Sequence, residues 1–365
     1  MDVMDSPDIA IFLDSRQQGG IETHALHLAR GLKKFGYSPS ILFYCRYNAD
    51  HPIEPLLHHH QIPFEYLDGK INSAGLWCRR HSPLLIHTHG YKANIIGRLA
   101  AKLTDTPIVS TFHNGDRGSG LIRLYHWFDE LTSRLSHNIA VSPEIALRLP
   151  EPVKLMNNFI EAPRWSATTG QEVAFVGRLS HEKGPDLFLQ LAKHLPDLHF
   201  TVYGSGNLHE TLAASKAPNV KFAGQVTSME PHWQQVGLLC ITSREEGLPL
   251  VALEAMAHGI PVLSFAVGAL PELIEAGSNG WIISEGNIKQ MSKQIRHWQC
   301  LSDEDKKKLA QTCIETIRKN YSYDAVIPEL LTLYRHAVNK AGYIWPEMPV
   351  QEQAQELLQE LPREQ

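Results

Sequence analysis

The chain has 365 residues, of which 43% are hydrophobic and 20% are charged, and its formal net charge at pH 7 is -5. This composition is typical of a globular enzyme, excludes a disordered or fibrous protein, and gives no reason to expect a nucleic acid as a partner. No segment reaches the roughly 18 consecutive apolar residues of a membrane-spanning helix, and the chain starts with acidic residues where a secretory signal is basic. We therefore expect a cytoplasmic protein.

Charge is distributed unevenly along the chain. Residues 1–165 carry 17 Lys and Arg, 16 Asp and Glu and twelve of the 20 His, whereas the remainder carries 17 Lys and Arg against 23 Asp and Glu. The first half becomes cationic if its histidines protonate, which suits an acceptor on an anionic membrane surface, although uneven charge is more often incidental.

The five cysteines are odd in number, scattered, and without the close pairs of a zinc site. We expect them to be reduced and mostly buried thiols. They are Cys45, Cys78, Cys240, Cys300 and Cys313.

Short runs of β-branched and aromatic residues alternate with helical segments, which predicts parallel sheets with crossover helices. In the first half, a helix that follows Gly20 repeats its apolar residues on one face and stops at Gly36. The strands predicted in this half cover residues 9–13, 41–44, 84–87, 108–112 and 139–141.

The first strand leads into a loop over residues 14–20 that ends in Gly19 and Gly20. Paired glycines let the backbone approach a ligand, and the helix start behind them offers free N–H groups to an anion. The loop lacks the G-x-G-x-x-G pattern of a dinucleotide site, which disfavours a hydride-transfer enzyme. An ordinary turn remains the alternative interpretation.

Between residues 160 and 170 the periodicity lapses into a segment rich in Pro, Ser, Thr and Gly, which is typical of an interdomain linker. A second strand and helix series follows, with strands at 173–176, 200–203, 220–222, 238–241 and 261–264. We predict an α/β fold with two doubly wound, Rossmann-like lobes and a central cleft. Residues 1–162 form the first lobe, joined by a C-terminal helix over about 325–345, and residues 170–322 form the second.

Ligands of such sheets bind beyond the carboxyl ends of the strands, so the loops that leave the strands are the candidate site. The loop over 177–184 places Arg178 and Lys183 at one strand end, in front of a helix start, which is the donor set that a diphosphate needs. The alternative is a solvated loop in which Glu182 pairs with Lys183. The loop over 203–207, with two glycines, is assigned to the wall of the cleft.

The stretch REEGLPLVALEAMAHG, residues 244–259, follows the strand at 238–241. Glu246 precedes a Gly-Leu-Pro turn, and Glu254 lies in the helix after the turn. The first carboxylate can accept hydrogen bonds from sugar hydroxyls and the second from ribose hydroxyls. Either acid alone would also be explained by favourable interaction with a helix dipole.

Taken together, the glycine pair, GRLSHEKG and EGLPLVALEAMA followed by GIPV resemble the motifs of the retaining glycosyltransferases of family 4, also described as glycosyl transferases group 1. This family has the two-lobed fold called GT-B. The resemblance covers residues 8 to about 335, with the motifs in the same order and spacing.

The resemblance implies a role for each matching residue. Gly19 and Gly20 would bind the donor diphosphate through the backbone, and Arg178 with Lys183 would neutralise its charge. Glu246 would bind hydroxyls of the transferred sugar.

The remaining implied contacts lie in both lobes. The amides of Leu250 and Val251 would bind phosphate, and Glu254 would hold the nucleotide ribose. His113, in the sequence TFHN, would contact the sugar 6-hydroxyl or the phosphate. Asn114 replaces the Asp of the family pattern, so no acid–base role is assigned to His113.

Three other sequence features resemble metal sites. Asp303-Glu304-Asp305 follows Ser302 and precedes three lysines, which predicts a capped helix start on the surface. For the histidines at 58–60 and for His87 with His89, acceptor contacts or solvent exposure are preferred to a metal role. We predict no metal.

The predicted activity is retaining transfer of a sugar from a nucleoside diphosphate sugar, the donor substrate, to a hydroxyl of a saccharide or lipid-linked acceptor, with no cofactor. Assembly of cell-surface polysaccharide or lipopolysaccharide is the expected setting. The alternatives are a noncatalytic nucleotide-sugar-binding subunit and a nucleotide-sugar epimerase or hydrolase of the same fold.

A segment of the first lobe mixes basic and aromatic residues around a predicted amphipathic helix: Arg117, Arg123, Tyr125, Trp127 and Phe128. Such a helix suits a lipid-linked acceptor and peripheral contact with the inner membrane surface, and an ordinary lobe helix explains it equally well.

Overall fold

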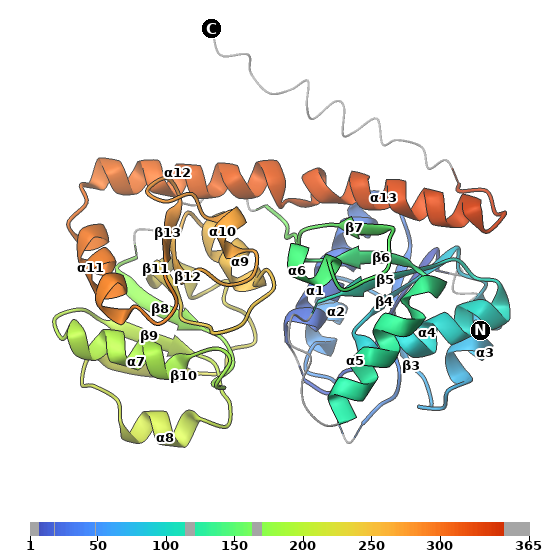
Figure 1. Ribbon diagram of the computed structural model, residues 1–365, viewed down its shortest axis with the longest axis horizontal. Helices are drawn as coiled ribbons and strands as arrows, with labels where there is room; N and C mark the ends of the chain where they lie inside the picture. Colours follow the sequence, from blue (N-terminus) through green and yellow to red (C-terminus); the bar gives the residue numbers. More distant parts are fainter. Residues whose placement is uncertain (1–6, 18, 48, 114–120, 163–169, 347–365) are drawn as a thin grey trace, which may run out of the picture.

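The structure, a computed structural model, describes residues 7–17, 19–47, 49–113, 121–162 and 170–346. The chain forms two lobes, each built on one parallel sheet (Figure 1). The first sheet has seven strands in the order β3-β2-β1-β4-β5-β6-β7, and the second has six in the order β10-β9-β8-β11-β12-β13. The predicted α/β class with two doubly wound, Rossmann-like lobes is confirmed.

The first sheet is covered by helices on both faces because its strands alternate two apolar faces. In β1, Ile9 and Ile11 enter one core with α1, α2 and α13, whereas Ala10 and Phe12 enter the other with α3 and α4. The strands are β1 (Ile9–Leu13), β2 (Pro39–Phe43), β3 (Phe64–Tyr66), β4 (Leu85–His89), β5 (Ile108–Phe112), β6 (His137–Ala140) and β7 (Val153–Leu155). The helices are α1 (Gly20–Lys34), α2 (Glu54–His59), α3 (Ser73–His81), α4 (Tyr91–Thr104), α5 (Leu121–Thr132), α6 (Pro143–Ala146) and α13 (Tyr323–Lys340).

The second lobe has one continuous core that extends across its sheet and helices. Its strands are β8 (Glu172–Val176), β9 (Phe200–Tyr203), β10 (Val220–Gly224), β11 (Val236–Ile241), β12 (Val262–Phe265) and β13 (Gly280–Ile283). Its helices are α7 (Pro185–His194), α8 (His209–Ala214), α9 (Leu250–Ala257), α10 (Leu270–Leu273), α11 (Ile288–Gln299) and α12 (Asp303–Asn320).

Three strands were not predicted from the sequence: β3, β7 and β13. β3 and β7 have three residues each and are partly exposed edge strands, so they carry no apolar alternation. β13 begins at a glycine and is an edge strand of the second sheet.

The chain crosses between the lobes twice, and the two crossings are hydrogen-bonded to each other. Ile160 donates its N–H to Tyr321 O at 2.9 Å and accepts from the N–H of Tyr323 at 3.1 Å. After the second crossing, α13 returns to the first lobe, where Ile327 and Tyr334 are fully buried. Figure 1 shows α12 and α13 running in succession along one side of both lobes.

Candidate active site between the lobes

The loops that leave β8 and β11 are joined tightly in the second lobe. Gly184 has a φ of 63°, and a Cβ on it would lie 2.0 Å from Thr242 O, so only glycine permits this approach. The Thr242 hydroxyl donates to Gly184 O at 2.8 Å. Arg244 N–H donates to Glu182 O at 2.8 Å. The two predicted loops are therefore one structural unit.

This unit brings Lys183 and Glu246 together. The Lys183 Nζ lies 2.7 Å from both carboxylate oxygens of Glu246, and the Ser243 hydroxyl donates to Oε1 at 2.6 Å. The Glu246 side chain is 7% exposed and that of Lys183 29% exposed. The Lys183 ammonium and the Glu246 carboxylate are thus held against each other in a defined geometry. The alternative pairing of Lys183 with Glu182 is not seen, because Glu182 lies beside Arg178 and Ser180.

Arg178 extends toward the first lobe. Its side chain is 64% exposed, and a Cβ built on Gly19 would lie 4.0 Å from its Nη2. The guanidinium therefore faces the start of α1 and is open to solvent between the lobes.

The glycine pair at the start of α1 leaves its backbone accessible. Gly20 is the first residue of the helix, and a Cβ on it would meet no atom within 4 Å. A Cβ on Gly19 would lie 3.1 Å from Glu22 Oε2. Burial raises the pKa of Glu22, although the Ser15 hydroxyl and, more weakly, the Arg178 guanidinium lower it. The helix N-terminus and Arg178 together can hold an anion.

The turn after Glu246 contacts the first lobe directly. A Cβ on Gly247 would lie 3.2 Å from His113 O, at the carboxyl end of β5. Asn158 of the first lobe donates its Nδ2–H to Leu248 O at 2.6 Å. The carboxyl ends of both sheets therefore meet at this point.

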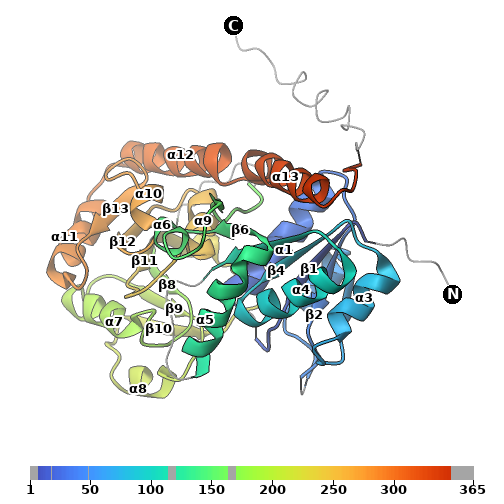
Figure 2. The ribbon, with the colours of Figure 1, turned by 45° about the vertical axis from the view of Figure 1, so that its right-hand side comes forward.

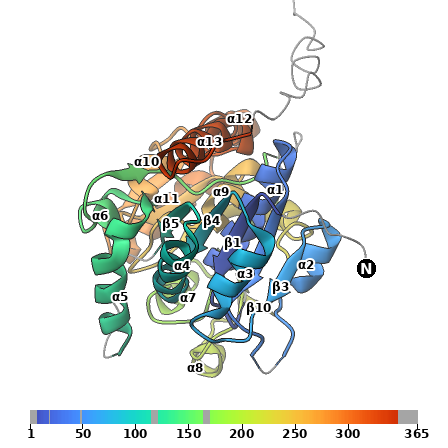
Figure 3. The same ribbon diagram turned by 90° about the vertical axis from the view of Figure 1, so that its right-hand side faces the viewer.

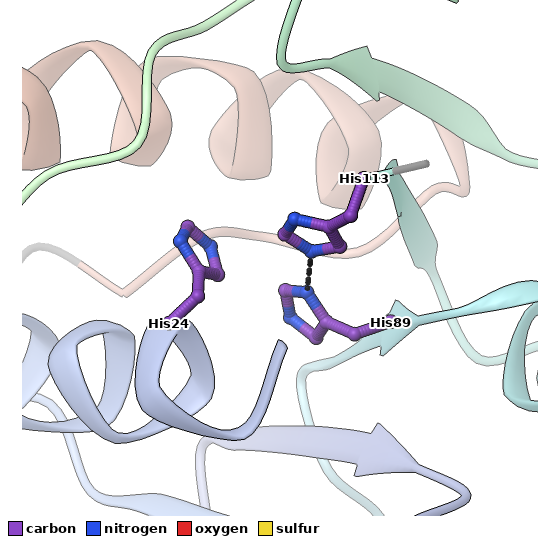
Figure 4. A group of neighbouring side chains, drawn as sticks. All are labelled: His24, His89 and His113. Carbon is purple, nitrogen blue, oxygen red and sulfur yellow. Dashed lines mark hydrogen bonds between the residues drawn. The ribbon is translucent and has the colours of Figure 1, made fainter. Parts of the chain in front are cut away.

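His113 belongs to a group of imidazoles on the first-lobe side (Figure 4). His89 Nδ1 lies 3.0 Å from His113 Nε2, and the His24 ring centroid lies 4.8 Å from that of His113. Burial lowers the pKa of His24 to about 4 and lowers the pKa values of His89 and His113 well below the usual range. All three rings are therefore neutral near pH 7. In the described part of the chain, His24 Nδ1 and His89 Nε2 have no hydrogen-bond partner.

Neutral imidazoles can ligate a metal or bind hydroxyl groups. One nitrogen from each of His24, His89 and His113 lies within 4.8 Å of the others, which is compatible with metal ligation after a small contraction. A metal would have to break the bond between His89 and His113, whereas hydroxyls can use the free nitrogens as they stand. We retain hydroxyl binding as the prediction.

The sequence analysis gave solvent exposure as one of two alternatives for His87 and His89. This alternative is wrong. Both are 1% exposed, and His87 is bonded to Tyr334 and to Thr111, the latter at 2.7 Å. These side chains lie on a central strand whose two faces are covered, so neither can reach solvent. His58 and His59, by contrast, are exposed.

Glu254 lies on α9, whose first turn carries Leu250 and Val251 and which packs against α1 of the first lobe. Burial raises the pKa of Glu254 to about 7, while His258 lowers it and Glu230 raises it. A carboxyl group in this state can both donate and accept hydrogen bonds near neutral pH.

The acidic triplet at 303–305 is a capped helix start, as the sequence predicts. All three side chains are exposed, and Ser302 Oγ accepts from the N–H of Asp305 at 3.1 Å. Asn114 and Arg117 lie outside the described residues.

Sequence reasoning missed Glu22, His24 and Asn158. Glu22 and His24 are polar residues at buried positions of α1, and a polar residue on the apolar face of a helix is the signal that could have identified them. Asn158 follows the last strand of the first lobe and carries no pattern of its own.

Two family profiles match the chain in succession. Residues 18–155 match the family described as Glycosyltransferase Family 4, and residues 170–299 match the family described as Glycosyl transferases group 1. One match lies in each lobe.

Among curated proteins, the chain is 30% identical to an uncharacterized glycosyltransferase of Haemophilus influenzae over 149 residues, 38% of this chain and 42% of that protein. It is 23% identical to the uncharacterized glycosyltransferase MJ1178 of Methanocaldococcus jannaschii over 335 residues, 87% of this chain and 94% of that protein. It is 28% identical to the O-antigen biosynthesis glycosyltransferase WbnH of Escherichia coli over 206 residues, 52% of this chain and 60% of that protein. The chain thus spans less than two thirds of the first and third of these relatives.

Solved structures with a similar arrangement include Anabaena Alr3699/HepE in complex with UDP-glucose, with a TM-score of 0.77 and 19% identity over 89% of this chain and 99% of that chain. Sucrose-phosphate synthase from Thermosynechococcus elongatus also has a TM-score of 0.77, with 16% identity over 90% of this chain and 98% of that chain. At these identities the similarity concerns the fold.

Proposed function

Because the chain belongs to the family 4 glycosyltransferases and has their two-lobed GT-B fold, we propose that it transfers a sugar from a nucleoside diphosphate sugar to a hydroxyl group of an acceptor. In this proposal the anomeric configuration is retained, and neither a metal ion nor another cofactor takes part. The relative in complex with UDP-glucose supports a nucleotide-sugar donor.

The observation that carries the proposal is the convergence of charges between the lobes. The Lys183–Glu246 pair lies on the second lobe, and Arg178 extends from the same lobe toward the glycine pair at the start of α1. A diphosphate needs two or more cationic or N–H donors around its oxygens, and a sugar needs a carboxylate for its hydroxyls. Both sets are present at the same interface.

In the proposed reaction the bond between the anomeric carbon and the phosphate oxygen breaks, and a bond to the acceptor oxygen forms on the same face. The acceptor proton passes to the departing phosphate. Negative charge grows on the leaving oxygen, so Arg178, Lys183 and the α1 amides would bind the transition state more strongly than the substrate. Glu246 would hold the sugar hydroxyls, and His113 would contact the sugar from the first lobe.

Ribose and phosphate contacts complete the proposed donor site. Glu254 would bind the ribose hydroxyls, and the amides of Leu250 and Val251 at the start of α9 would bind phosphate. These three residues lie on one short helix that packs against α1, so the nucleotide would span the interface between the lobes.

The proposed setting is the assembly of a cell-surface polysaccharide or lipopolysaccharide in the cytoplasm, with a saccharide or lipid-linked acceptor. The similarity to the E. coli protein of O-antigen biosynthesis supports this setting.

The test begins by screening nucleotide sugars for stabilisation of the protein against thermal unfolding, since a matched donor stabilises the folded state. Release of nucleoside diphosphate is then measured with the matched donor and an excess of EDTA. We expect release to persist in EDTA, the product to keep the anomeric configuration, and the double variant Arg178→Ala/Lys183→Ala to lose release by at least about 1000-fold.

The control for this experiment is Arg296→Ala/Lys308→Ala, which removes two exposed cations of the same lobe that pair with Asp197 and Glu304. Its activity should equal that of the wild type. Donor binding without any product would instead identify a noncatalytic binding subunit, and release of free or epimerised sugar would identify a hydrolase or an epimerase.

A further inference from the structure

Three histidines of the first lobe meet although they come from separate parts of the chain. His24 lies in α1, His89 ends β4, and His113 follows β5. Strand β1, which leads into α1, pairs with β4, and β4 pairs with β5, so the carboxyl ends of the three strands adjoin (Figure 3). Among the described residues, this is the one group of three or more His, Cys, Asp or Glu side chains placed to share a metal ion.

Two buried nitrogens of this cluster are available to a ligand. His24 is 4% exposed and His89 is 1% exposed, and within the described residues neither His24 Nδ1 nor His89 Nε2 has a hydrogen-bond partner. A buried polar atom without a partner is destabilising, and a ligand removes that cost. The neighbouring His87 differs, because its two nitrogens are bonded to Tyr334 and Thr111. His87 therefore packs against the His89 ring and is not itself a ligand.

The spacing of the three rings suits a tetrahedral ion. Zn²⁺ binds imidazole nitrogens at about 2.0–2.1 Å, which places two ligands of a tetrahedral site about 3.3 Å apart. His89 Nδ1 and His113 Nε2 lie 3.0 Å apart in their hydrogen bond. The ion would replace this single bond, whose net contribution to stability is small, by a bond to each ring. His24 would supply the third ligand after small ring movements, since one nitrogen of each ring lies within 4.8 Å of the others.

The chemistry of the cluster selects the kind of metal. Neutral imidazole suits Zn²⁺, whereas Mg²⁺ and Ca²⁺ prefer oxygen ligands. Burial lowers the pKa values of all three rings, so protons do not compete with the ion near pH 7. Three ligands leave a fourth position for water or a hydroxyl group. The partly exposed His113 gives the ion a route from solvent.

We propose that His24, His89 and His113 form a binding site for Zn²⁺, and that the bound ion inhibits the enzyme. Zn²⁺ takes no part in the transfer reaction in this proposal. Without the ion, the same nitrogens remain free for hydroxyl groups. The inhibition rests on the proposed function, whereas the binding of Zn²⁺ does not.

The location of the cluster gives Zn²⁺ a consequence for the site between the lobes. A Cβ on Gly247, next to Glu246, would lie 3.2 Å from His113 O. Helix α1, which carries His24, packs against α9 of the second lobe (Figure 2). The ion would therefore lie on the first-lobe side of the donor site and hold the His113 ring that the sugar is proposed to contact.

Binding is measured by isothermal titration calorimetry of the full chain, stripped of metal with EDTA and exchanged into buffer without chelator. We expect one Zn²⁺ per chain with a micromolar or lower Kd, and no heat of binding with MgCl₂. His24→Phe keeps a ring against Phe159 and removes a ligand nitrogen, so it should weaken Zn²⁺ binding at least about 100-fold. His89→Gln should weaken it similarly, and thermal unfolding shows whether each variant folds.

The matched control is His58→Gln/His59→Gln, which removes two exposed histidines of α2 and should bind Zn²⁺ like the wild type. Co²⁺ bound to the wild type should show the intense visible absorption of a tetrahedral complex, a readout that needs no variant. The site is overturned if the wild type does not bind Zn²⁺, if Co²⁺ shows only weak octahedral absorption, or if the control loses binding. It is also overturned if His24→Phe or His89→Gln folds and binds Zn²⁺ undiminished.

Release of nucleoside diphosphate from the matched donor tests the inhibition. At low donor concentration, Zn²⁺ at about ten times its Kd fills about nine sites in ten, so release should fall about tenfold. EDTA should restore release, and Mg²⁺ at the same concentration should have no effect. Undiminished release by the Zn²⁺-loaded protein would overturn the inhibition and leave the binding site. If no donor is turned over, the inhibition falls with the proposed function, while calorimetry still decides whether the site exists.

Discussion

The Lys183–Glu246 pair defines the residue-scale chemistry of the site, because each side chain is held by the other when no ligand is bound. In the proposed donor complex we expect the pair to divide, with the ammonium meeting phosphate and the carboxylate meeting hydroxyls. Glu246 is nearly buried and keeps a second donor in Ser243, so its orientation persists when Lys183 turns toward a ligand. This separation of roles gives the two residues different expected effects on binding and on turnover.

Glu246→Gln should lower turnover by about 100-fold, because the charged acceptor for the sugar hydroxyls is lost in the transition state. The affinity for the nucleoside diphosphate should stay the same or rise, since Lys183 loses a competing carboxylate. Turnover is measured with the matched donor, and affinity by isothermal titration calorimetry. Glu210→Gln, at an exposed position of α8, is the control. A fall in nucleotide affinity equal to the fall in turnover would contradict the assignment.

Glu254 predicts a pH dependence of stability in the unliganded protein. Its pKa is raised from 4.5 to about 7, so between these values the folded protein keeps a proton that the unfolded chain has lost. The free energy of unfolding should therefore fall as pH rises from 4.5 to 7, by up to about 3 kcal/mol. Glu254→Gln should abolish this loss, and chemical denaturation at several pH values measures it. An unchanged pH profile in Glu254→Gln would show that the carboxyl group is ionised in the folded protein.

At the scale of elements, the β8–α7 and β11–α9 loops act as one unit because Gly184 permits their close contact. Gly184→Ala would place a Cβ 2.0 Å from Thr242 O at a residue whose φ is 63°. Gly286 has a similar φ of 71°, and a Cβ on it would meet nothing within 4 Å. The two positions therefore share the conformational strain and differ in the steric contact.

Gly286→Ala should destabilise the protein by about 1 kcal/mol, which is the conformational cost alone. Gly184→Ala should cost at least about 2 kcal/mol more, because the loops must move apart. It should also weaken nucleotide binding, since Lys183 and Glu246 are then separated. Thermal unfolding and calorimetry measure both effects, and equal effects of the two variants would exclude the close contact.

The loops that line the candidate site could be located from the sequence because they carry local signals. Gly184 and Gly247 each follow a charged residue, Lys183 and Glu246, and each lets the backbone approach another segment closely. The edge strands β3 and β7 could not be predicted, because three partly exposed residues have no periodicity. His24 and Asn158 could not be assigned either, since their neighbours come from segments far along the chain. Such contacts are a property of tertiary packing.

At the scale of the whole molecule, α13 belongs to the core of the first lobe although it follows the second lobe in sequence. Ile327 is fully buried there, and a Cβ on Gly31 of α1 would lie 2.8 Å from its Cδ1. The two crossings are the covalent connections between the lobes, and they are hydrogen-bonded to each other at Ile160 and Tyr321. This arrangement suits rotation of one lobe against the other around a donor.

Ile327→Ala should destabilise the first lobe by about 2–4 kcal/mol, as expected for truncation of a fully buried isoleucine. Ile317→Ala on α12 should destabilise the second lobe to a similar degree, because Ile317 is fully buried in that core. Differential scanning calorimetry should show each variant lowering a different part of the unfolding profile. If both variants lower the same single transition equally, the lobes unfold as one cooperative unit and the expectation of two separable unfolding steps is wrong.

The central claim is that a cationic site between the lobes receives the diphosphate of a nucleotide sugar. The most direct measurement is a crystal structure of the protein with the nucleoside diphosphate of its matched donor. We expect phosphate oxygens within hydrogen-bond distance of Arg178, Lys183 and the N–H of Gly20, with Lys183 turned from Glu246 toward the phosphate. A nucleotide bound with its phosphates away from Arg178 and Lys183, or a Lys183–Glu246 pair left undivided beside it, would contradict the account.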